Sequence, residues 1–78
     1  MPLAFVLINS ELGKEESITK ELRNLNEIKE VHLIYGVYDL IAKVEAEDTE
    51  KLKEMIAFKI RRLKDIRSTL TLTVVEGV

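Results

Sequence analysis

Continuous apolar runs along the chain alternate with amphipathic stretches. Leu3 to Ile8 is apolar throughout, which is typical of a central strand covered on both faces. Two further strand-like runs extend from Val31 to Val37 and from Tyr38 to Val44, and Gly36 allows a tight turn between them. From Ser68 to Glu76, threonine alternates with leucine and valine. This pattern predicts a fourth strand.

Two stretches between these strands have the period of an α-helix. The first runs from Lys14 to Asn26 and the second from Thr49 to about Lys64. Phe58 lies off the apolar stripe of the second helix, so we expect the chain end or another subunit to cover it. The stripe residues are Ile18, Leu22 and Leu25 in the first helix and Leu52, Ile56 and Leu63 in the second. Basic residues complement the negative end of the second helix: Lys59, Arg61, Arg62, Lys64 and Arg67.

The predicted order is strand, helix, strand, strand, helix, strand. With right-handed crossovers, this order gives an α+β ferredoxin-like βαββαβ sandwich, in which a four-stranded antiparallel sheet carries both helices on one face. We expect residues 1–78 to form a single domain, because the chain has only 78 residues. A chain of this size buries only about 60–65% of its unfolded surface, so oligomerisation is an expected source of further stability.

The other face of the predicted sheet has no helix over it. Its composition is too apolar for simple exposure, so we expect a homodimer that forms through the sheet, face to face or edge to edge. The alternative is that a few exposed isoleucine and threonine residues need no partner. Besides half of the first strand, we expect this face to carry His32, Ile34, Asp39, Ile41, Lys43, Thr69, Thr71, Thr73 and Val75.

Composition narrows the functional classes. The chain has no cysteine, which excludes a disulfide framework, a zinc–thiolate site and a thiol redox centre. The net charge of −2 gives no general attraction to nucleic acid or to an anionic membrane. No run is long enough to span a membrane and no signal peptide is evident, so we expect a cytoplasmic protein. His32 has no orienting partner in the sequence, so we expect no catalytic site, metal site or cofactor.

The hairpin VHLIYGVYDLIAKV, Val31 to Val44, and the threonine-rich strand Ser68 to Val75 resemble the effector-binding (RAM) domain of the Lrp/AsnC regulators, the feast/famine regulatory proteins. Gly36 and Asp39 match the Gly-x-x-Asp pattern of that family. The resemblance covers essentially the whole chain in element order. Regulators of the family also carry an N-terminal helix-turn-helix, and nothing precedes Pro2 here. The resemblance therefore implies a stand-alone bacterial or archaeal form, for which we expect no direct DNA binding.

The resemblance also implies what the domain does. It implies dimers that assemble into an octameric or decameric ring, a small amino-acid effector bound between dimers, and full-length Lrp/AsnC regulators as further partners. A zwitterionic amino acid needs an acceptor for its ammonium group and donors for its carboxylate. The ligand-binding residues that the family pattern implies are Gly36, Tyr38, Asp39, Thr69 and Thr71.

These residues suit the expected chemistry. Asp39 can accept from the ammonium group, and backbone N–H groups from Gly36 to Tyr38 can approach the carboxylate because Gly36 has no side chain. Thr69 and Thr71 offer hydroxyls, and Tyr38 can line a pocket for the ligand's side chain.

Structural interpretations of the same residues remain open. Gly36 can be required only for the conformation of the turn, and Asp39 can simply cap a backbone N–H within it. Threonine is a good strand former whether or not it binds a ligand. Two other functions also remain open. One is a ligand-free, ACT-like or purely structural interaction module. The other is a dimeric α/β-barrel enzyme in which His32 acts at the sheet face.

Overall fold

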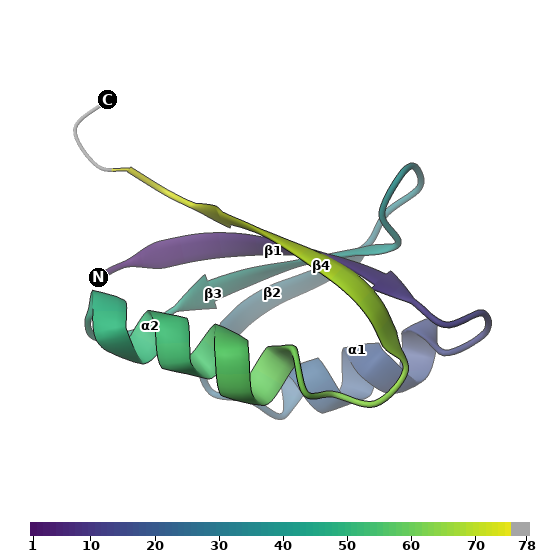
Figure 1. Cartoon of the computed structure of the whole chain (residues 1–78), viewed down its shortest axis with the longest axis horizontal. Coiled ribbons are helices and arrows are strands. Elements are labelled where there is room, and N and C mark those ends of the chain that lie inside the picture. The colour runs from purple at the N-terminus through teal and green to yellow at the C-terminus, as the bar shows by residue number, and fades with distance from the viewer. Residues whose placement is uncertain (76–78) are drawn as a thin grey trace.

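The computed structural model describes residues 1–75. The strands form one antiparallel sheet in the order β2-β3-β1-β4, and both helices lie on the same face of it (Figure 1). The predicted α+β ferredoxin-like fold is therefore confirmed. In chain order the elements are β1 (Leu3–Ser10), α1 (Glu15–Arg23), β2 (Ile28–Leu33), β3 (Leu40–Glu45), α2 (Thr49–Met55), η1 (Ile56–Ile60) and β4 (Ile66–Thr73).

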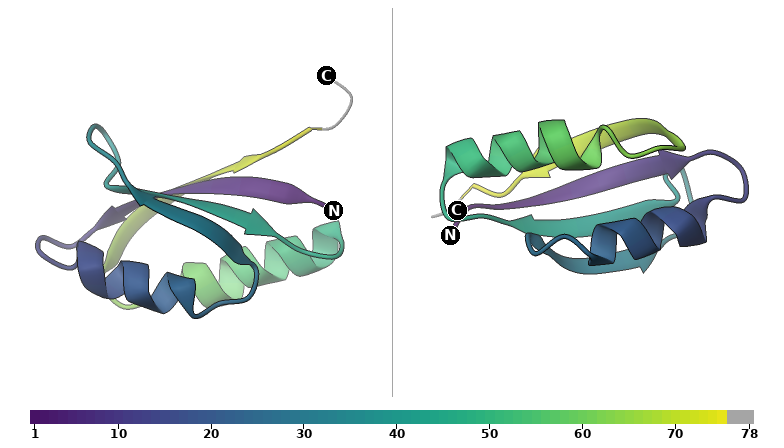
Figure 2. Two further views of the ribbon diagram at one scale, coloured as in Figure 1. Left: turned by 180° about the vertical axis from the view of Figure 1, so that it is seen from behind. Right: turned by 90° about the horizontal axis from the view of Figure 1, so that it is seen from below.

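The core lies between the sheet and the two helices. Every second residue of the two central strands, β1 and β3, points at the helices and is buried, and the apolar ones are fully buried. The helices close the core from below in the view of Figure 1, with α2 on the β4 side and α1 on the β2 side (Figure 2). The core residues of the sheet are Ala4, Val6, Ile8, Val31, Leu40, Ala42 and Val44, and those of the helices are Ile18, Leu22, Leu52, Met55, Ile56 and Ile60.

The second helix begins as predicted but ends earlier and changes its winding. Asp48 caps it, because its carboxylate oxygen Oδ1 accepts from the N–H of Lys51 at 2.8 Å. After Met55 the chain continues as a π-helical turn, in which the N–H of Arg61 donates to the carbonyl of Ile56 at 3.0 Å. The predicted extension to Lys64 was wrong, and the first helix is likewise shorter than predicted. Phe58 stays exposed, with the guanidinium of Arg62 5.0 Å from its ring centroid.

The β2–β3 connection is a six-residue loop, residues 34–39, and not a tight turn at Gly36. The N–H of Ile34 donates to the carbonyl of Asp39 at 2.9 Å, which closes the base of the loop. The loop stands off the sheet on the side away from the helices (Figures 1 and 2). Tyr35 is fully exposed and Val37 is 85% exposed. The predicted strand from Val31 to Val37 was wrong at both ends, because β2 begins at Ile28 and ends at Leu33.

The register of β4 reverses the predicted assignment of its two faces. Thr71 pairs with Val6 of the core, whereas Leu70 and Leu72 pair with Leu7 and Phe5. Directly paired residues share a face, so the leucines lie on the uncovered face and Thr69, Thr71 and Thr73 face the helices. The prediction that these threonines lie on the uncovered face was wrong. Alternation defines the two faces of a strand but not which one is buried. Val75 lies beyond the end of β4, and Glu76, the predicted last strand residue, is outside the described residues.

Candidate ligand-binding site

Asp39 lies at the corner of the sheet where β1 ends and β3 and β4 begin. Its oxygen Oδ2 accepts from the backbone N–H of Ser10 at 3.0 Å and lies 3.4 Å from the Ser10 hydroxyl, which also donates to it. Its own N–H donates to the carbonyl of Ile8 at 3.0 Å. Side chain and backbone are therefore both fixed to β1. The structural interpretation of Asp39 is correct in that the carboxylate caps a backbone N–H, although that N–H belongs to β1 and not to the turn.

A cavity of about 370 Å³ opens beside this carboxylate. The amide nitrogen Nδ2 of Asn9 donates to the hydroxyl oxygen of Ser68 at 3.2 Å along the same row of the sheet. Val37 is the one apolar residue in the lining, so the cavity offers a carboxylate, a guanidinium, an amide and hydroxyls to a small polar ligand. The lining residues are Asn9, Ser10, Val37, Asp39, Arg67 and Ser68.

Gly36 and Tyr38 flank the loop residue that borders this cavity. Gly36 has a φ of 154°, a backbone conformation that side-chain-bearing residues rarely adopt, although an added Cβ would meet no atom within 4 Å. The glycine is therefore required by backbone conformation and not by space. Tyr38 is half-buried at the end of the loop. It is Val37, between them, that lines the cavity at Asp39.

Thr69 and Thr71 line a different depression. With Thr73 they form one wall of a groove of about 420 Å³ between β4 and the second helix. Within one chain, the structure therefore does not bring the two predicted threonines together with Asp39. The opposite wall consists of Thr49, Leu52, Lys53, Ile56, Ala57 and Arg61.

The uncovered face of the sheet carries an apolar surface, which we call the sheet patch. Leu70 and Leu72 in it are 43% and 49% exposed, although each lies beside a residue of the central strand. No element within residues 1–75 covers this patch (Figure 2). The sheet patch comprises Phe5, Leu7, Ile41, Leu70 and Leu72.

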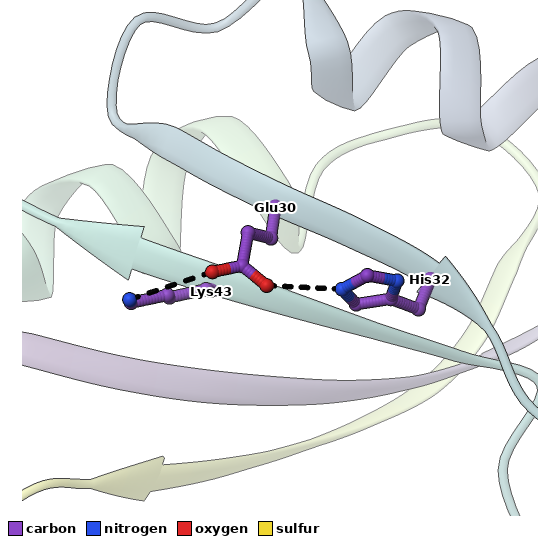
Figure 3. A network of polar contacts seen from close by, with 3 residues as sticks. All are labelled: Glu30, His32 and Lys43. Carbon is purple, nitrogen blue, oxygen red and sulfur yellow. Dashed lines mark hydrogen bonds and ion pairs between the residues drawn. The ribbon is translucent and has the colours of Figure 1, made fainter.

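A polar network lies beside the sheet patch on β2 and β3 (Figure 3). The Nε2 atom of His32 lies 3.0 Å from one carboxylate oxygen of Glu30, and Nζ of Lys43 lies 3.5 Å from the other. The hydrogen bond from His32, followed by the bond and charge of Lys43, lowers the pKa of Glu30 from its ordinary value of 4.5. The only histidine is therefore engaged in a polar network on the surface.

Within residues 1–75, no group of three or more potential metal ligands gathers. No helix in this part of the chain has the length and hydropathy to cross a membrane.

Sequence reasoning missed four residues of the Asp39 cavity. Asn9 and Ser10 directly follow the apolar run from Leu3 to Ile8, and the sequence pattern gave them no role in binding. Arg67 was interpreted as part of the basic end of the second helix, but it lies on β4. Ser68 was placed on a strand without a role. Polar residues at the end of an apolar strand were the one available signal, and it does not reveal which strands meet there.

Comparisons with known proteins identify the family and agree with the fold. Residues 3–78 match the family model described as the Lrp/AsnC ligand binding domain. The chain is 46% identical over 55 residues to a homocitrate synthase of Saccharolobus islandicus, covering 70% of this chain and 12% of that enzyme. It is 30% identical over 69 residues to an uncharacterised HTH-type transcriptional regulator of Pyrococcus abyssi, covering 88% of this chain and 44% of the regulator. The chain thus spans less than half the length of either curated relative.

A solved structure matches over its full length. The crystal structure of FFRP-DM1 superposes with a TM-score of 0.93 at 37% sequence identity, covering 96% of this chain and 100% of that chain.

Proposed function

Because the chain belongs to the Lrp/AsnC ligand-binding domain family, we propose that it is an oligomerising regulatory domain that binds a small amino acid. The observation that carries this proposal is the cavity of about 370 Å³ at Asp39. An anchored carboxylate there can accept from an ammonium group, and hydroxyl, amide and guanidinium groups can donate to a carboxylate. The residues proposed for the ligand are Gly36, Tyr38, Asp39, Thr69 and Thr71.

The complete site is proposed to take residues from two copies of the chain. Asp39 and the pair Thr69 and Thr71 line separate depressions of one chain, so a site that contains all three needs a second copy. The loop of residues 34–39 stands off the sheet with Tyr35 and Val37 exposed, which lets it reach a neighbour. A loop of one copy against the groove of another is a head-to-tail contact, and contacts of this kind can close into rings. An octameric or decameric ring with an amino acid between dimers is the proposed assembly.

The dimer within that ring is proposed to form through the sheet patch. Half-exposed leucines beside apolar residues of the central strand make a surface that a second sheet can cover at the usual spacing of about 10 Å. The pairing is then isologous, with the same patch contributed by both copies.

Native mass spectrometry with and without the twenty amino acids tests the proposal. We expect an even-numbered assembly that gains one amino-acid mass per subunit. Asp39→Asn keeps an oxygen for the Ser10 N–H but removes the charge, so it should retain the assembly and weaken binding by about tenfold or more. Glu50→Gln, the same change of charge on an exposed position of α2, is the matched control and should bind normally.

The contrary outcomes separate the alternatives. A stable assembly that takes up none of the amino acids would favour the ligand-free, ACT-like module. Catalytic turnover of a substrate by the wild-type protein, lost in His32→Ala, would favour the α/β-barrel enzyme.

A second candidate function is regulation of a biosynthetic enzyme. The similarity to a homocitrate synthase favours it, because the matching segment there is part of an enzyme chain. Mixing the chain with a full-length Lrp/AsnC regulator or with that homocitrate synthase distinguishes the two functions. Mixed assemblies with the regulator support a role in transcription, whereas an amino-acid-dependent change in synthase activity supports a role beside the enzyme.

A further inference from the structure

We propose that Arg67 binds the carboxylate of the ligand in the Asp39 cavity, so that a single chain holds both charges of an α-amino acid. The assignment rests on the proposed function and deepens it. It replaces the backbone N–H groups of the β2–β3 loop, which sequence reasoning favoured as carboxylate donors, with a guanidinium on β4.

A β-bulge places Arg67 at this cavity. Ser68 pairs with Asn9 and Ile66 pairs with Ser10, so Arg67 is the extra residue and has no partner on β1. A bulge interrupts the regular alternation of side chains and re-aims the extra residue, and bulges are frequent beside functional sites. Here the extra residue is the cationic member of the cavity lining.

Arg67 and Asp39 border one small cavity and form no ion pair with each other. Three ion pairs occur among residues 1–75, namely Glu30–Lys43, Glu47–Lys51 and Glu27–Lys59, and His32 also contacts Glu30. Neither Asp39 nor Arg67 takes part in them. No ion pair joins the two opposite charges at this cavity of about 370 Å³, so a ligand that brings both complementary charges can bind to each of them.

The chemistry of the two groups fits the two ends of a zwitterion. Asp39 is held by Ser10 and offers a fixed acceptor for an ammonium group. Arg67 offers a planar fork of donors that matches the two oxygens of a carboxylate, a geometry that lysine cannot reproduce. No other residue in the lining carries a positive charge. The cavity therefore distinguishes a free amino acid from a derivative that lacks the carboxylate.

Isothermal titration calorimetry with the twenty L-amino acids and their α-amides tests this assignment. The amide keeps the ammonium group and the side chain but lacks the negative charge. We expect the wild-type assembly to prefer the acid over its amide by about tenfold or more, and Arg67→Gln to lose that preference by weakening the acid alone. Arg67→Lys should keep part of the preference. Arg62→Gln, on the exposed helix end against Phe58, should leave it unchanged.

Each outcome bears on one of the two proposals. If Arg67→Gln binds acid and amide with the wild-type ratio, the assignment of Arg67 is overturned while amino-acid binding stands. If the wild-type protein binds no amino acid, the proposed function fails and the assignment with it. The ratio of acid to amide is measured within each variant, so a modest loss of stability in Arg67→Gln does not obscure the result.

Discussion

The two faces of the sheet are built from the same strands but differ in what completes them. On β1, Val6 and Ile8 face the helices and are fully buried, whereas Phe5 and Leu7 face the other way and stay partly exposed. Both sets are equally apolar, so hydrophobicity alone does not explain the difference. Within one chain, the helices cover only the face that carries Val6 and Ile8. We infer that the uncovered face contacts a partner, whereas the helix-covered face forms the core of the folded chain.

The largest effect expected from this comparison concerns stability. Leu40 and Ile41 are adjacent on β3 and lie on opposite faces. Leu40→Ala should lower the free energy of unfolding by about 2–5 kcal/mol, because it leaves a cavity in a fully buried core. Ile41→Ala should cost less than half as much at low protein concentration. Urea unfolding followed by circular dichroism measures both, and equal losses in the dilute protein would contradict the division of roles between the faces.

The next effect concerns assembly. Leu72→Glu places a charge in the sheet patch and should weaken self-association by about 30-fold or more, because a buried interface residue can contribute roughly 2 kcal/mol. Thr71→Glu, one residue earlier and on the helix side of the strand, lies in the groove proposed for contacts between dimers, so it should weaken the ring but leave the dimer intact. Sedimentation equilibrium measures both variants. Dissociation by Thr71→Glu with Leu72→Glu unaffected would place the dimer contact at the groove beside α2 instead.

The contrast between the faces also explains how far the sequence could predict the fold. Element order, sheet type and the helix-facing stripe follow from hydrophobic periodicity, and Ile18, Leu22, Leu52 and Ile56 are core residues as predicted. The register of β4 could not be predicted from periodicity. Its residues alternate regularly between two faces, and only the pairing with β1 shows which face is turned to the helices. The π-helical turn at residues 56–60 also leaves no mark in the spacing of apolar residues.

The candidate site was predictable only in part, for a related reason. Gly36 and Asp39 stand out because a glycine and a carboxylate interrupt apolar runs. Arg67 does not stand out, because its position depends on a one-residue bulge between strands more than 50 residues apart in the chain. Local pattern identifies unusual residues, but long-range register determines which of them meet.

A smaller effect separates the structural role of Asp39 from its proposed role in binding. Asp39→Ala removes the acceptor for the Ser10 N–H at the edge of the helix-covered face and should cost about 0.5–1.5 kcal/mol of stability. Asp39→Asn should cost less, since its amide oxygen can still accept that bond. Thermal unfolding of the two variants without ligand checks this difference. Identical losses would mean that the charge, and not the hydrogen bond, stabilises this corner of the sheet.

The smallest effect is a dependence on pH that belongs to the uncovered face. Glu30 has a lowered pKa in the folded chain because His32 and Lys43 bind its carboxylate. Its contribution to stability is therefore fully present above its unfolded pKa, about 4.5, and is lost as the pH falls through the lower folded value.

Comparing the urea midpoints of the wild type and Glu30→Gln between about pH 6 and pH 3 isolates this contribution. In a dilute monomer the difference should be small, because the network is exposed to solvent. If sheets pair face to face, the network lies at the rim of the interface, and the difference should grow with protein concentration. If the difference between the two urea midpoints does not depend on protein concentration, Glu30 lies outside any interface and the sheet contact is confined to the β1–β4 side.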